Sequence, residues 1–357
     1  MEEKKLISGI QQIGIGIPNV HEAWAWYREH FGMDVKVFEE AAEAALMINY
    51  TGNEVQARHA ILALNMQGGG GMEIWQYTSR EPQLPEFEPL LGDLGILFCK
   101  IKSRNVEGSY FEMQKKNLNI HGDLNIGPDG KKHFYVRDPW DNVFQVVEGD
   151  DDWFKREKHL CGGVYGAIVG VSDIDESLKV YRDILGFDRV VYDEIDTFHD
   201  FRAVSGGDRR VRRVLLSHSE PHQGGFSRLL GNNQIELVQW LDGKGRKVFE
   251  NRYWGDRGFI HLCFDIRGME ALKQECKEKG FPFTVDSANS FDMGEAAGHF
   301  SYIEDPDGTL IELVETHKVP IVKKLGWYLD LRKRKPGKNL PNWMVRAMGL
   351  SRPKPKV

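Results

Sequence analysis

Gln12-Ile-Gly-Ile-Gly-Ile-Pro-Asn19 returns later in the chain as Gly166-Ala-Ile-Val-Gly-Val-Ser-Asp173, and a helix-like run follows each copy. The offset between the copies is 154 residues, and the same offset separates Tyr27 from Tyr181. A fixed offset at several positions indicates an internal repeat. We therefore expect two copies of one fold, which differ in function where their polar residues diverge.

The composition is that of a soluble globular protein. With 357 residues, 41% hydrophobic and 28% charged, the chain suits two domains with separate cores. It has no run of about 18 apolar residues that would span a bilayer, and its start, Met-Glu-Glu-Lys-Lys-Leu, lacks the apolar core of a signal peptide. Its four cysteines form no C-x-x-C pair, which favours reduced thiols. We expect a cytoplasmic protein.

The C-terminal segment, residues 317–357, is basic and contains tryptophans. Residues 318–357 include twelve Lys or Arg and one acid, a net charge of +11. Because the whole chain has a net charge of −6, the rest of the chain has a net charge of −17. This pattern fits short amphipathic helices at an anionic membrane surface, or packing and self-association against an acidic body. No nucleic-acid partner is expected, because the remaining charge is strongly negative. Both a monomer and a dimer remain open.

Each half of the chain shows one strand, one helix and several strands, twice over. In the first module the strand is Gln11–Ile17 and the helix is His21–Phe31, with apolar residues at helical spacing and Gly32 as the stop. We predict two domains, at 8–149 and 162–316. Their four modules are 8–79, 92–149, 162–242 and 257–316.

The second module illustrates the expected architecture. Its pattern predicts a strand at Leu94–Ile101, a helix at Val106–Lys116, and strands at Phe134–Val136 and Val143–Val147. A βαβββ module has one open, apolar sheet face to bury, so two modules form an incomplete barrel around a cleft. The expected fold class is α+β, with four βαβββ modules in two open barrels and candidate ligands on the concave faces.

Two strand positions recur in every module, one near its first strand and one near its last. In module order the pairs are Gln12 and Glu73, Ile96 and Gln145, Gly166 and Glu236, and His261 and Glu312. Apolar residues flank each position, so a carboxylate that faces inward there should be paired or should coordinate a metal. Singly, each polar residue also fits an ordinary strand or core role, but their matched positions favour a site.

The chain resembles the vicinal oxygen chelate superfamily, the group of glyoxalase I, bleomycin-resistance proteins and extradiol dioxygenases. The resemblance covers roughly residues 8–316. It is most specific in Val171-Ser-Asp-Ile-Asp-Glu-Ser-Leu-Lys-Val-Tyr-Arg-Asp-Ile-Leu-Gly186 and Asp305-Pro-Asp-Gly-Thr-Leu-Ile-Glu-Leu-Val-Glu315. It implies a metal shared by two modules, each of which supplies one residue from its first strand and one from its last.

The ligand set depends on which modules pair. Pairing of neighbours gives two incomplete sets: Gly166, Glu236, His261 and Glu312, and Gln12, Glu73, Ile96 and Gln145. Pairing of the first module with the fourth gives Gln12, Glu73, His261 and Glu312, which is similar to the ligand set of glyoxalase I. We expect the second arrangement. Its imidazole, carboxylates and amide suit a divalent ion, with Zn, Ni, Co, Mn or Fe left open.

The resemblance to glyoxalase I implies a lyase, isomerase or epimerase that moves a proton next to a carbonyl through a metal-bound enediolate. Glu312 would be the base and Glu73 a ligand that returns the proton on the other face. Arg257, just before the strand of His261, is the candidate to bind an anionic group of a small substrate with vicinal oxygens, and a surface salt bridge is the alternative role for it. A glutathione substrate is not indicated, because Gly16 stands where glyoxalase I carries an arginine.

Two other functions remain open. An extradiol-type dioxygenase requires two histidines and a glutamate, but Gly166 stands where the first histidine belongs, so His199 or another histidine would have to replace it. A binding protein similar to the bleomycin-resistance relatives would hold a ligand in the same cleft without chemistry, and the many aromatic residues suit such a pocket.

Overall fold

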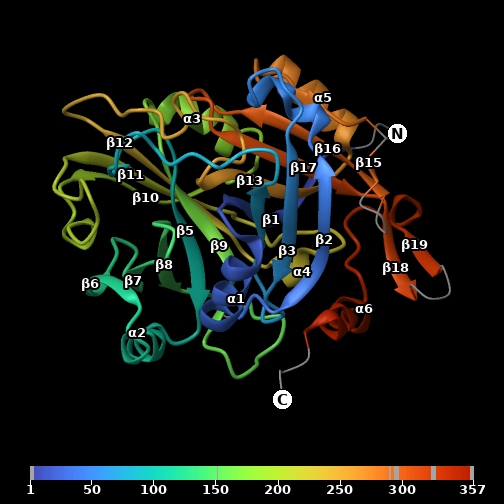
Figure 1. Ribbon diagram of the computed structural model, residues 1–357, viewed down its shortest axis with the longest axis horizontal. Helices are drawn as coiled ribbons and strands as arrows, with labels where there is room; N and C mark the ends of the chain where they lie inside the picture. The colour runs from blue at the N-terminus through green and yellow to red at the C-terminus, as the bar shows by residue number, and fades with distance from the viewer. Residues whose placement is uncertain (1–3, 151, 289–290, 293–296, 323–326, 354–357) are drawn as a thin grey trace.

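The computed structural model describes residues 4–150, 152–288, 291–292, 297–322 and 327–353, and is shown in Figure 1. The first module contains β1 (Leu6–Gly16), α1 (Val20–Phe31), β2 (Val35–Glu43), η1 (Ala45–Tyr50), β3 (Ala57–Leu64) and β4 (Gly71–Tyr77). The second contains β5 (Gly95–Ser103), α2 (Val106–Lys115), β6 (Asn119–Ile126), β7 (Lys132–Arg137) and β8 (Val143–Glu148).

The second half of the chain repeats this order and ends in a short appendage. The third module contains β9 (Cys161–Gly170), α3 (Ile174–Tyr181), β10 (Arg189–Asp196), η2 (His199–Phe201), β11 (Val211–Ser217), α4 (Ser227–Leu230) and β12 (Gln234–Trp240). The fourth contains β13 (Gly258–Arg267), α5 (Met269–Glu278), β14 (Val285–Asp286), β15 (Phe291–Asp292), β16 (Ala297–Glu304) and β17 (Leu310–Thr316). The appendage contains β18 (Lys318–Val322), β19 (Trp327–Asp330), η4 (Leu331–Lys333), α6 (Asn342–Ala347) and η5 (Met348–Ser351).

The strands form two large mixed sheets, which confirms the predicted α+β class and the two open barrels. The first and fourth modules form one nine-stranded sheet, in the order β14-β16-β17-β13-β1-β4-β3-β2 with β15 beside β16. The second and third modules form the other sheet, in the order β10-β11-β12-β9-β5-β8-β7-β6. Each sheet therefore takes strands from both chain ranges, 8–149 and 162–316, and the blue and orange strands in Figure 1 belong together.

The repeated sequence motif places the same helix start in two modules. The side chain of Asn19 accepts hydrogen bonds from the first backbone N–H groups of α1, and the side chain of Asp173 does the same for α3. Such caps satisfy donors that have no partner within the helix. Gly32 ends α1 with φ 68°, a left-handed conformation that favours glycine. The motif thus marks the strand-to-helix turn of each half.

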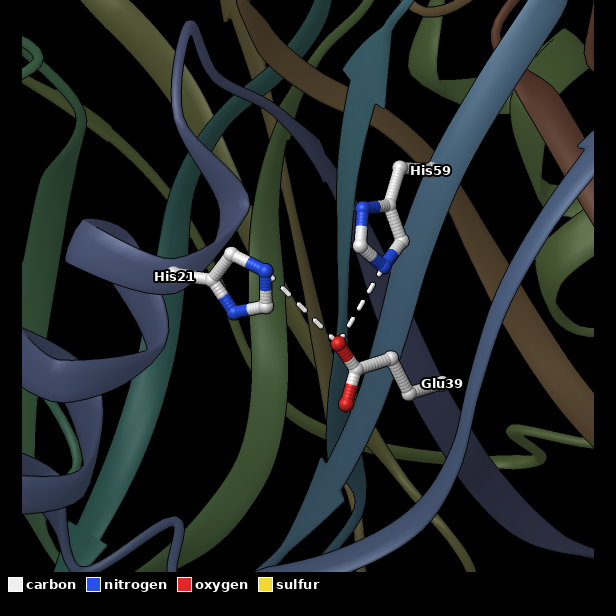
Figure 2. A group of neighbouring side chains, drawn as sticks. All are labelled: His21, Glu39 and His59. Carbon is white, nitrogen blue, oxygen red and sulfur yellow. Dashed lines mark ion pairs between the residues drawn. The ribbon is translucent and has the colours of Figure 1, made fainter.

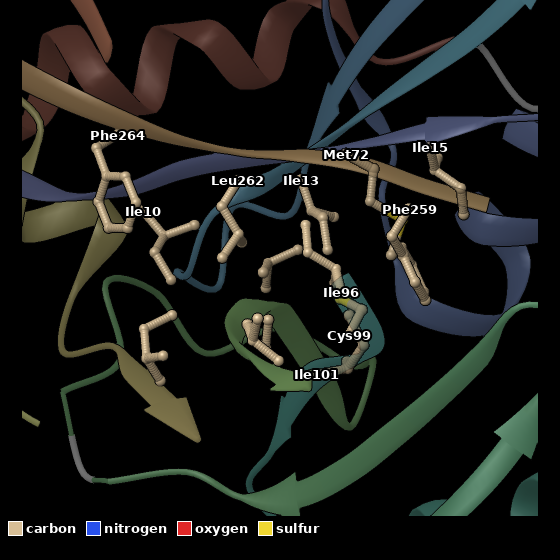
Figure 3. Close-up of a cluster of buried hydrophobic side chains, with 14 of the residues drawn as sticks. Ile10, Ile13, Ile15, Met72, Ile96, Cys99, Ile101, Phe259, Leu262 and Phe264 are labelled. Atoms are coloured by element: carbon tan, nitrogen blue, oxygen red, sulfur yellow. The ribbon is translucent and has the colours of Figure 1, made fainter. Parts of the chain in front are cut away.

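The main core lies between the two sheets. Figure 3 shows side chains of β1 and β13, such as Ile13 and Leu262, facing Ile96, Cys99 and Ile101 of β5. Ile13, Leu262, Cys99 and Ile101 are fully buried. Because side chains alternate across a strand, the neighbours of these core residues point to the opposite, concave face of the nine-stranded sheet. The core therefore decides which polar residues face the barrel interior.

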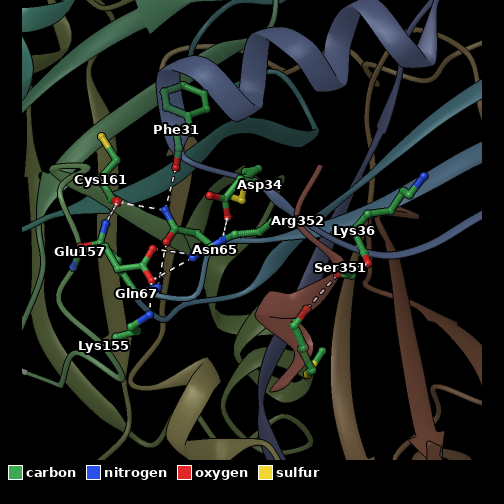
Figure 4. A network of polar contacts seen from close by, with 12 residues as sticks. Phe31, Asp34, Lys36, Asn65, Gln67, Lys155, Glu157, Cys161, Ser351 and Arg352 are labelled. Carbon is green, nitrogen blue, oxygen red and sulfur yellow. Dashed lines mark hydrogen bonds and ion pairs between the residues drawn. The ribbon is translucent and has the colours of Figure 1, made fainter. Parts of the chain in front are cut away.

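The basic C-terminal segment packs against the body of the protein. Leu340 and Val345 are buried against the first and third modules, while Trp343 is 63% exposed and Leu350 is 87% exposed. Figure 4 shows Arg352, whose Nε donates to Asp34 at 2.9 Å and whose Nη1 donates to Glu157 at 3.1 Å. Packing against the acidic body, one of the two expected roles, is thus present. Within the described ranges, no helix has the length and apolar character needed to cross a membrane.

Candidate metal centre

The four central strands of the nine-stranded sheet bring four predicted residues together. Glu312 comes from β17, His261 from β13, Gln12 from β1 and Glu73 from β4, and these strands are consecutive neighbours. All four side chains lie on the concave face, because the alternating positions fill the core. Pairing of the first with the fourth module is therefore the arrangement that the structure adopts.

The polar atoms of this group are close enough to share one ion. Nε2 of His261 lies 3.3 Å from Oε2 of Glu73 and 3.2 Å from Oε2 of Glu312. Nε2 of Gln12 lies 3.3 Å and 3.5 Å from the same two oxygens. Donor atoms that bind a divalent ion at about 2.0–2.2 Å lie roughly 3 Å from one another. The spacing thus matches a single coordination sphere.

Several atoms of the group are buried without a hydrogen-bond partner. Among the described residues, both ring nitrogens of His261 and Oε1 of Gln12 have no well-aligned hydrogen-bond partner, although Nε2 of His261 lies beside the two carboxylates. A buried polar atom without a partner is costly unless something else binds it. Rotation of the Gln12 amide exchanges its oxygen and nitrogen, and would turn the unpartnered oxygen toward the carboxylates and the imidazole. The donor set and its unpartnered atoms therefore fit a divalent metal.

The charges of Glu73, His261 and Glu312 favour the binding of a cation. Burial lowers the pKa of His261, but Glu312 and Glu73 outweigh this and raise the pKa to about 9. Burial raises the pKa of Glu312, whereas the nearby charge of His261 and the adjacent side chains of Cys263 and Tyr302 bring the pKa below its ordinary value. Two buried carboxylates facing one imidazole leave a net negative charge that a divalent ion would neutralise.

Three neighbours complete the group, and the sequence did not reveal them as site residues. Cys263 and Tyr302 interact with Glu312, and the ring of Tyr302 meets that of His261 edge-on at 5.6 Å. Trp254 stacks on His261 at 6.3 Å. The sequence did contain a sign of Tyr302, because a tyrosine stands ten residues before the recurring position in two modules: Tyr302 before Glu312 and Tyr135 before Gln145. In the structure each tyrosine lies opposite that residue on the neighbouring strand.

Gly14 allows the imidazole to lie against strand β1. A Cβ atom on Gly14 would come within 2.4 Å of Cε1 and 2.7 Å of Nε2 of His261. Such distances are well inside van der Waals contact, so any other residue would displace the ring. The first glycine of the Gln12–Asn19 motif, Gly14, therefore positions the histidine of the fourth module.

Arg257 and His199 do not join the four-residue group. Nη2 of Arg257 donates a hydrogen bond to the carbonyl of Trp140 at 3.2 Å, so this guanidinium contacts the second module. The predicted role of Arg257 in binding an anionic substrate group thus stays a prediction. His199 is exposed in η2, while its neighbour Asp200 is buried against Arg213 of the other barrel.

The corresponding centre of the eight-stranded sheet contains the protein's own cations. Glu236 is fully buried, lies 2.5 Å from Nζ of Lys100 and accepts a short hydrogen bond from Nε of Arg213. The hydroxyl of Tyr192 donates to Glu236 at 2.9 Å. Nη1 of Arg213 also binds Asp200, at 2.7 Å. This barrel therefore neutralises its buried carboxylates without an added ion.

The two barrels differ at one register position that explains the contrast. Leu215 of β11 lies opposite Glu236, as Leu62 of β3 lies opposite Glu73. Two residues before these leucines stand Arg213 in one barrel and Ala60 in the other. An alanine leaves room at the centre, whereas the arginine fills it with positive charge. Glu236 and Asp200 thus form a charge-balanced centre with Lys100 and Arg213 instead of an ion site. The expectation that Ile96 matches His261 is wrong, because Ile96 points into the core between the two sheets and the register places Phe98 at that position.

Glu236 should make the stability of the protein sensitive to acid. Burial raises the pKa of Glu236, but Arg213 and Lys100 outweigh this and lower it to about 2, from an ordinary value of about 4.3. A depressed acid pKa contributes stability above the unfolded-state value and loses it as the pH falls toward the folded-state value. We expect wild type to be more stable than Glu236→Gln, and the difference in unfolding free energy to reach its maximum above about pH 5.

Chemical denaturation of both proteins between pH 2 and pH 7 measures this difference. It should shrink steadily as the pH falls from about 4.3 to about 2, because in this range the unfolded chain binds a proton at Glu236 and the folded protein does not. Carboxyl groups distant from Glu236 are common to both proteins, so their contributions cancel in the comparison. A difference that stays constant down to about pH 2 would contradict the ion-paired state of Glu236.

Comparison with known proteins gives the same fold. The model of the Glyoxalase/Bleomycin resistance protein/Dioxygenase superfamily matches residues 9–146 and 161–313. Lactoylglutathione lyase of Schizosaccharomyces pombe is 27% identical over 150 residues, 41% of this chain and 45% of that protein. The chain thus spans less than half the length of this curated relative.

Two solved structures extend the likeness over most of the chain. Glyoxalase I from Zea mays has a TM-score of 0.52 at 12% identity, covering 88% of this chain and 93% of that one. A candidate dioxygenase from Bacillus subtilis has a TM-score of 0.55 at 13% identity, covering 87% and 86%. At these identities the two structures show a shared fold only. The membership of the chain in a family rests on the match to the family model. The chain belongs to the Glyoxalase/Bleomycin resistance protein/Dioxygenase superfamily.

Proposed function

We propose that the protein is a metal-dependent, glyoxalase-like lyase or isomerase that moves a proton next to a carbonyl group. The observation that carries this proposal is the convergence of Gln12, Glu73, His261 and Glu312 on one buried point, with unpartnered donor atoms facing it. In the other barrel the matching point is filled by Lys100 and Arg213. One catalytic site per chain is therefore proposed.

The four residues would hold a divalent ion such as Zn²⁺, Ni²⁺, Co²⁺, Mn²⁺ or Fe²⁺. When bound, the ion supplies Lewis-acid stabilisation of negative charge that develops on a substrate oxygen. An imidazole, an amide oxygen and two carboxylates suit all of these ions, so the residues alone do not select among them.

Glu312 is the proposed base that removes the proton. Its carboxylate is kept ionised by His261, Cys263 and Tyr302, which favour the charged form although the group is buried. Glu73 lies on the far side of His261, also in contact with Nε2. One carboxylate can remove a proton from a substrate carbon next to a carbonyl, and the other can return a proton to the planar intermediate that results.

The walls around the group suggest the class of substrate. Trp75 and Trp254 contact each other at 4.7 Å between ring centroids, and their buried indole N–H groups have no hydrogen-bond partner in the part of the chain that the structure describes. Aromatic walls with free donors suit a substrate that combines an apolar part with neighbouring oxygens. Hemithioacetals of 2-oxoaldehydes have this chemistry, and the likeness to a lactoylglutathione lyase supports testing glutathione as the thiol.

The experiment is a proton-exchange assay on metal-loaded protein. The purified chain is analysed for bound metal, loaded with Zn²⁺, Ni²⁺, Co²⁺, Mn²⁺ or Fe²⁺ in turn, and mixed in D₂O with thiol adducts of methylglyoxal and phenylglyoxal. We expect deuterium at the carbon next to the carbonyl, and faster turnover of the phenylglyoxal adducts. Oxygen uptake with a catechol would instead support the dioxygenase function, and tight ligand binding without metal would support a binding protein.

Gly14→Ala should weaken metal binding without altering any ligand. The new methyl group would lie 2.4 Å from the ring of His261, so the ring must move out of place. We expect Zn²⁺ affinity to fall at least about tenfold and the unfolding free energy to fall by about 1–3 kcal/mol. Gly225→Ala is the control, because its nearest neighbours lie 3.7 Å away. Equal Zn²⁺ affinity in the two variants and wild type would count against the site.

A further inference from the structure

A second group of metal-binding side chains lies on the surface of the first module. Figure 2 shows the rings of His21 and His59 both pointing at the carboxylate of Glu39. Nε2 of His59 lies 3.3 Å, and Nε2 of His21 3.6 Å, from Oε1 of Glu39. One ligand atom from each residue lies within 4.8 Å of the others. Two imidazoles and a carboxylate therefore meet at one point.

Three separate elements supply these residues and hold them in place. His21 is in the first turn of α1, where its backbone N–H is fixed by the Asn19 cap. Glu39 is on β2 and His59 on β3, and the register pairs Glu39 with Ile61 and Ala41 with His59. Glu39 and His59 are thus diagonal neighbours on one face of an antiparallel pair, close enough for their side chains to meet.

The surroundings orient the carboxylate and leave the site open to solvent. Nζ of Lys36 contacts Oε2 of Glu39 at 2.5 Å, so the other oxygen, Oε1, is the one presented to the two rings. The side chains of His21, His59 and Glu39 are 61%, 24% and 27% exposed. An ion can therefore reach the group from solvent without any rearrangement of the core.

The group is on the opposite face of the sheet from the candidate metal centre. His59 alternates with Ala60, whose side chain joins the concave cluster around Trp75. Ile61, two residues after His59, belongs to the core beneath α1. Because alternate residues of β3 face opposite sides, an ion at His59 would be separated from His261 by the sheet itself.

We propose that His21, Glu39 and His59 form a second, surface site for a transition-metal ion of the Zn²⁺ type. Two imidazoles favour Zn²⁺, Cu²⁺ or Ni²⁺ over Ca²⁺ and Mg²⁺, which prefer oxygen ligands. Three protein ligands leave a position for water. The site is independent of the proposed catalytic function, because it uses none of the same residues.

An ion at this site would tie helix α1 to the edge of the sheet. β2 is the last strand of the nine-stranded sheet, and Glu39 belongs to it. An ion that binds the folded chain and not the unfolded one raises the apparent stability. Bound Zn²⁺ should therefore raise the melting temperature by fastening the N-terminal turn of α1 to β2 and β3.

The test is a Zn²⁺ titration of the full chain near pH 8, where free imidazoles are neutral. Wild type, His59→Gln, His21→Gln, His261→Gln and His199→Gln are compared by calorimetry and thermal melting. His199→Gln is the matched control, because it removes an exposed histidine outside both groups. Circular dichroism checks that each variant is folded.

We expect wild type and His199→Gln to bind two Zn²⁺ per chain. In His59→Gln and His21→Gln, the Zn²⁺ ion at the surface site should bind at least about tenfold more weakly. Its effect on the melting temperature should be lost. His261→Gln should still bind one Zn²⁺ at the surface site. The surface site can therefore be tested even if the proposed catalytic site binds no metal. Equal surface binding in His59→Gln, His21→Gln and wild type would overturn the proposal, as would Zn²⁺ binding that only His261→Gln abolishes.

Discussion

Glu312→Gln should lower the rate of deuterium exchange next to the carbonyl by about 100- to 10,000-fold, the range expected for loss of a general base. Gln has nearly the same size as Glu and keeps one oxygen that can bind a metal, but it cannot take up the proton. Glu312 is buried among Cys263 and Tyr302, so the substitution leaves the packing in place. Exchange measured by NMR at saturating metal separates loss of the base from loss of the ion.

Glu73→Gln and Glu194→Gln are the companions of this experiment. Glu73 shares the site, so its loss should also slow exchange, whereas Glu194 is an exposed strand residue and its loss should have no effect. Metal analysis of each variant shows how much ion is retained. Wild-type exchange rates in both Glu312→Gln and Glu73→Gln, with metal bound, would eliminate proton transfer by these carboxylates.

Arg213→Met should destabilise the protein by about 3–5 kcal/mol, the usual effect of removing one partner from a buried ion pair. The guanidinium is 1% exposed and contacts both Glu236 and Asp200. Without it, Glu236 would retain its pair with Lys100, and Asp200 would be left beside the imidazole of His133. Methionine retains the apolar stem, so the lost stability reports mainly the uncompensated charge. Urea denaturation of wild type and variant measures the difference.

Arg212→Met is the control for this prediction because Arg212 is the adjacent residue on the same strand. Its guanidinium pairs with Asp193 and Asp175, whose carboxylates are 42% and 72% exposed. Exposed pairs contribute about 0–1 kcal/mol, so Arg212→Met should change stability by no more than that. Equal effects of the two substitutions would mean that the centre of this barrel is not held together by its ion pairs.

Local features of the fold were readable from the chain. The repeated segment predicted the strand-to-helix turns correctly because Asn19, Gly32 and Asp173 act on backbone groups within a few residues of themselves. The strand β6, Asn119–Ile126, was not predicted, since it is a polar edge strand with no residue fully buried. Its apolar residues Ile120 and Leu124 alternate with polar ones and pack partly against the core, but Gly122 interrupts the alternation between them, so the run gives only a weak strand signal.

The sequence by itself determined the modules, their order and the residue types at the recurring strand positions, because caps and side-chain alternation are local. Only the tertiary structure decided that β1 pairs with β13, and so which four positions meet. It also decided that Lys100 and Arg213, from two different modules, fill the other centre. The physical reason is that such pairings depend on apolar faces that are buried together from distant parts of the chain, and no short-range pattern records which faces meet.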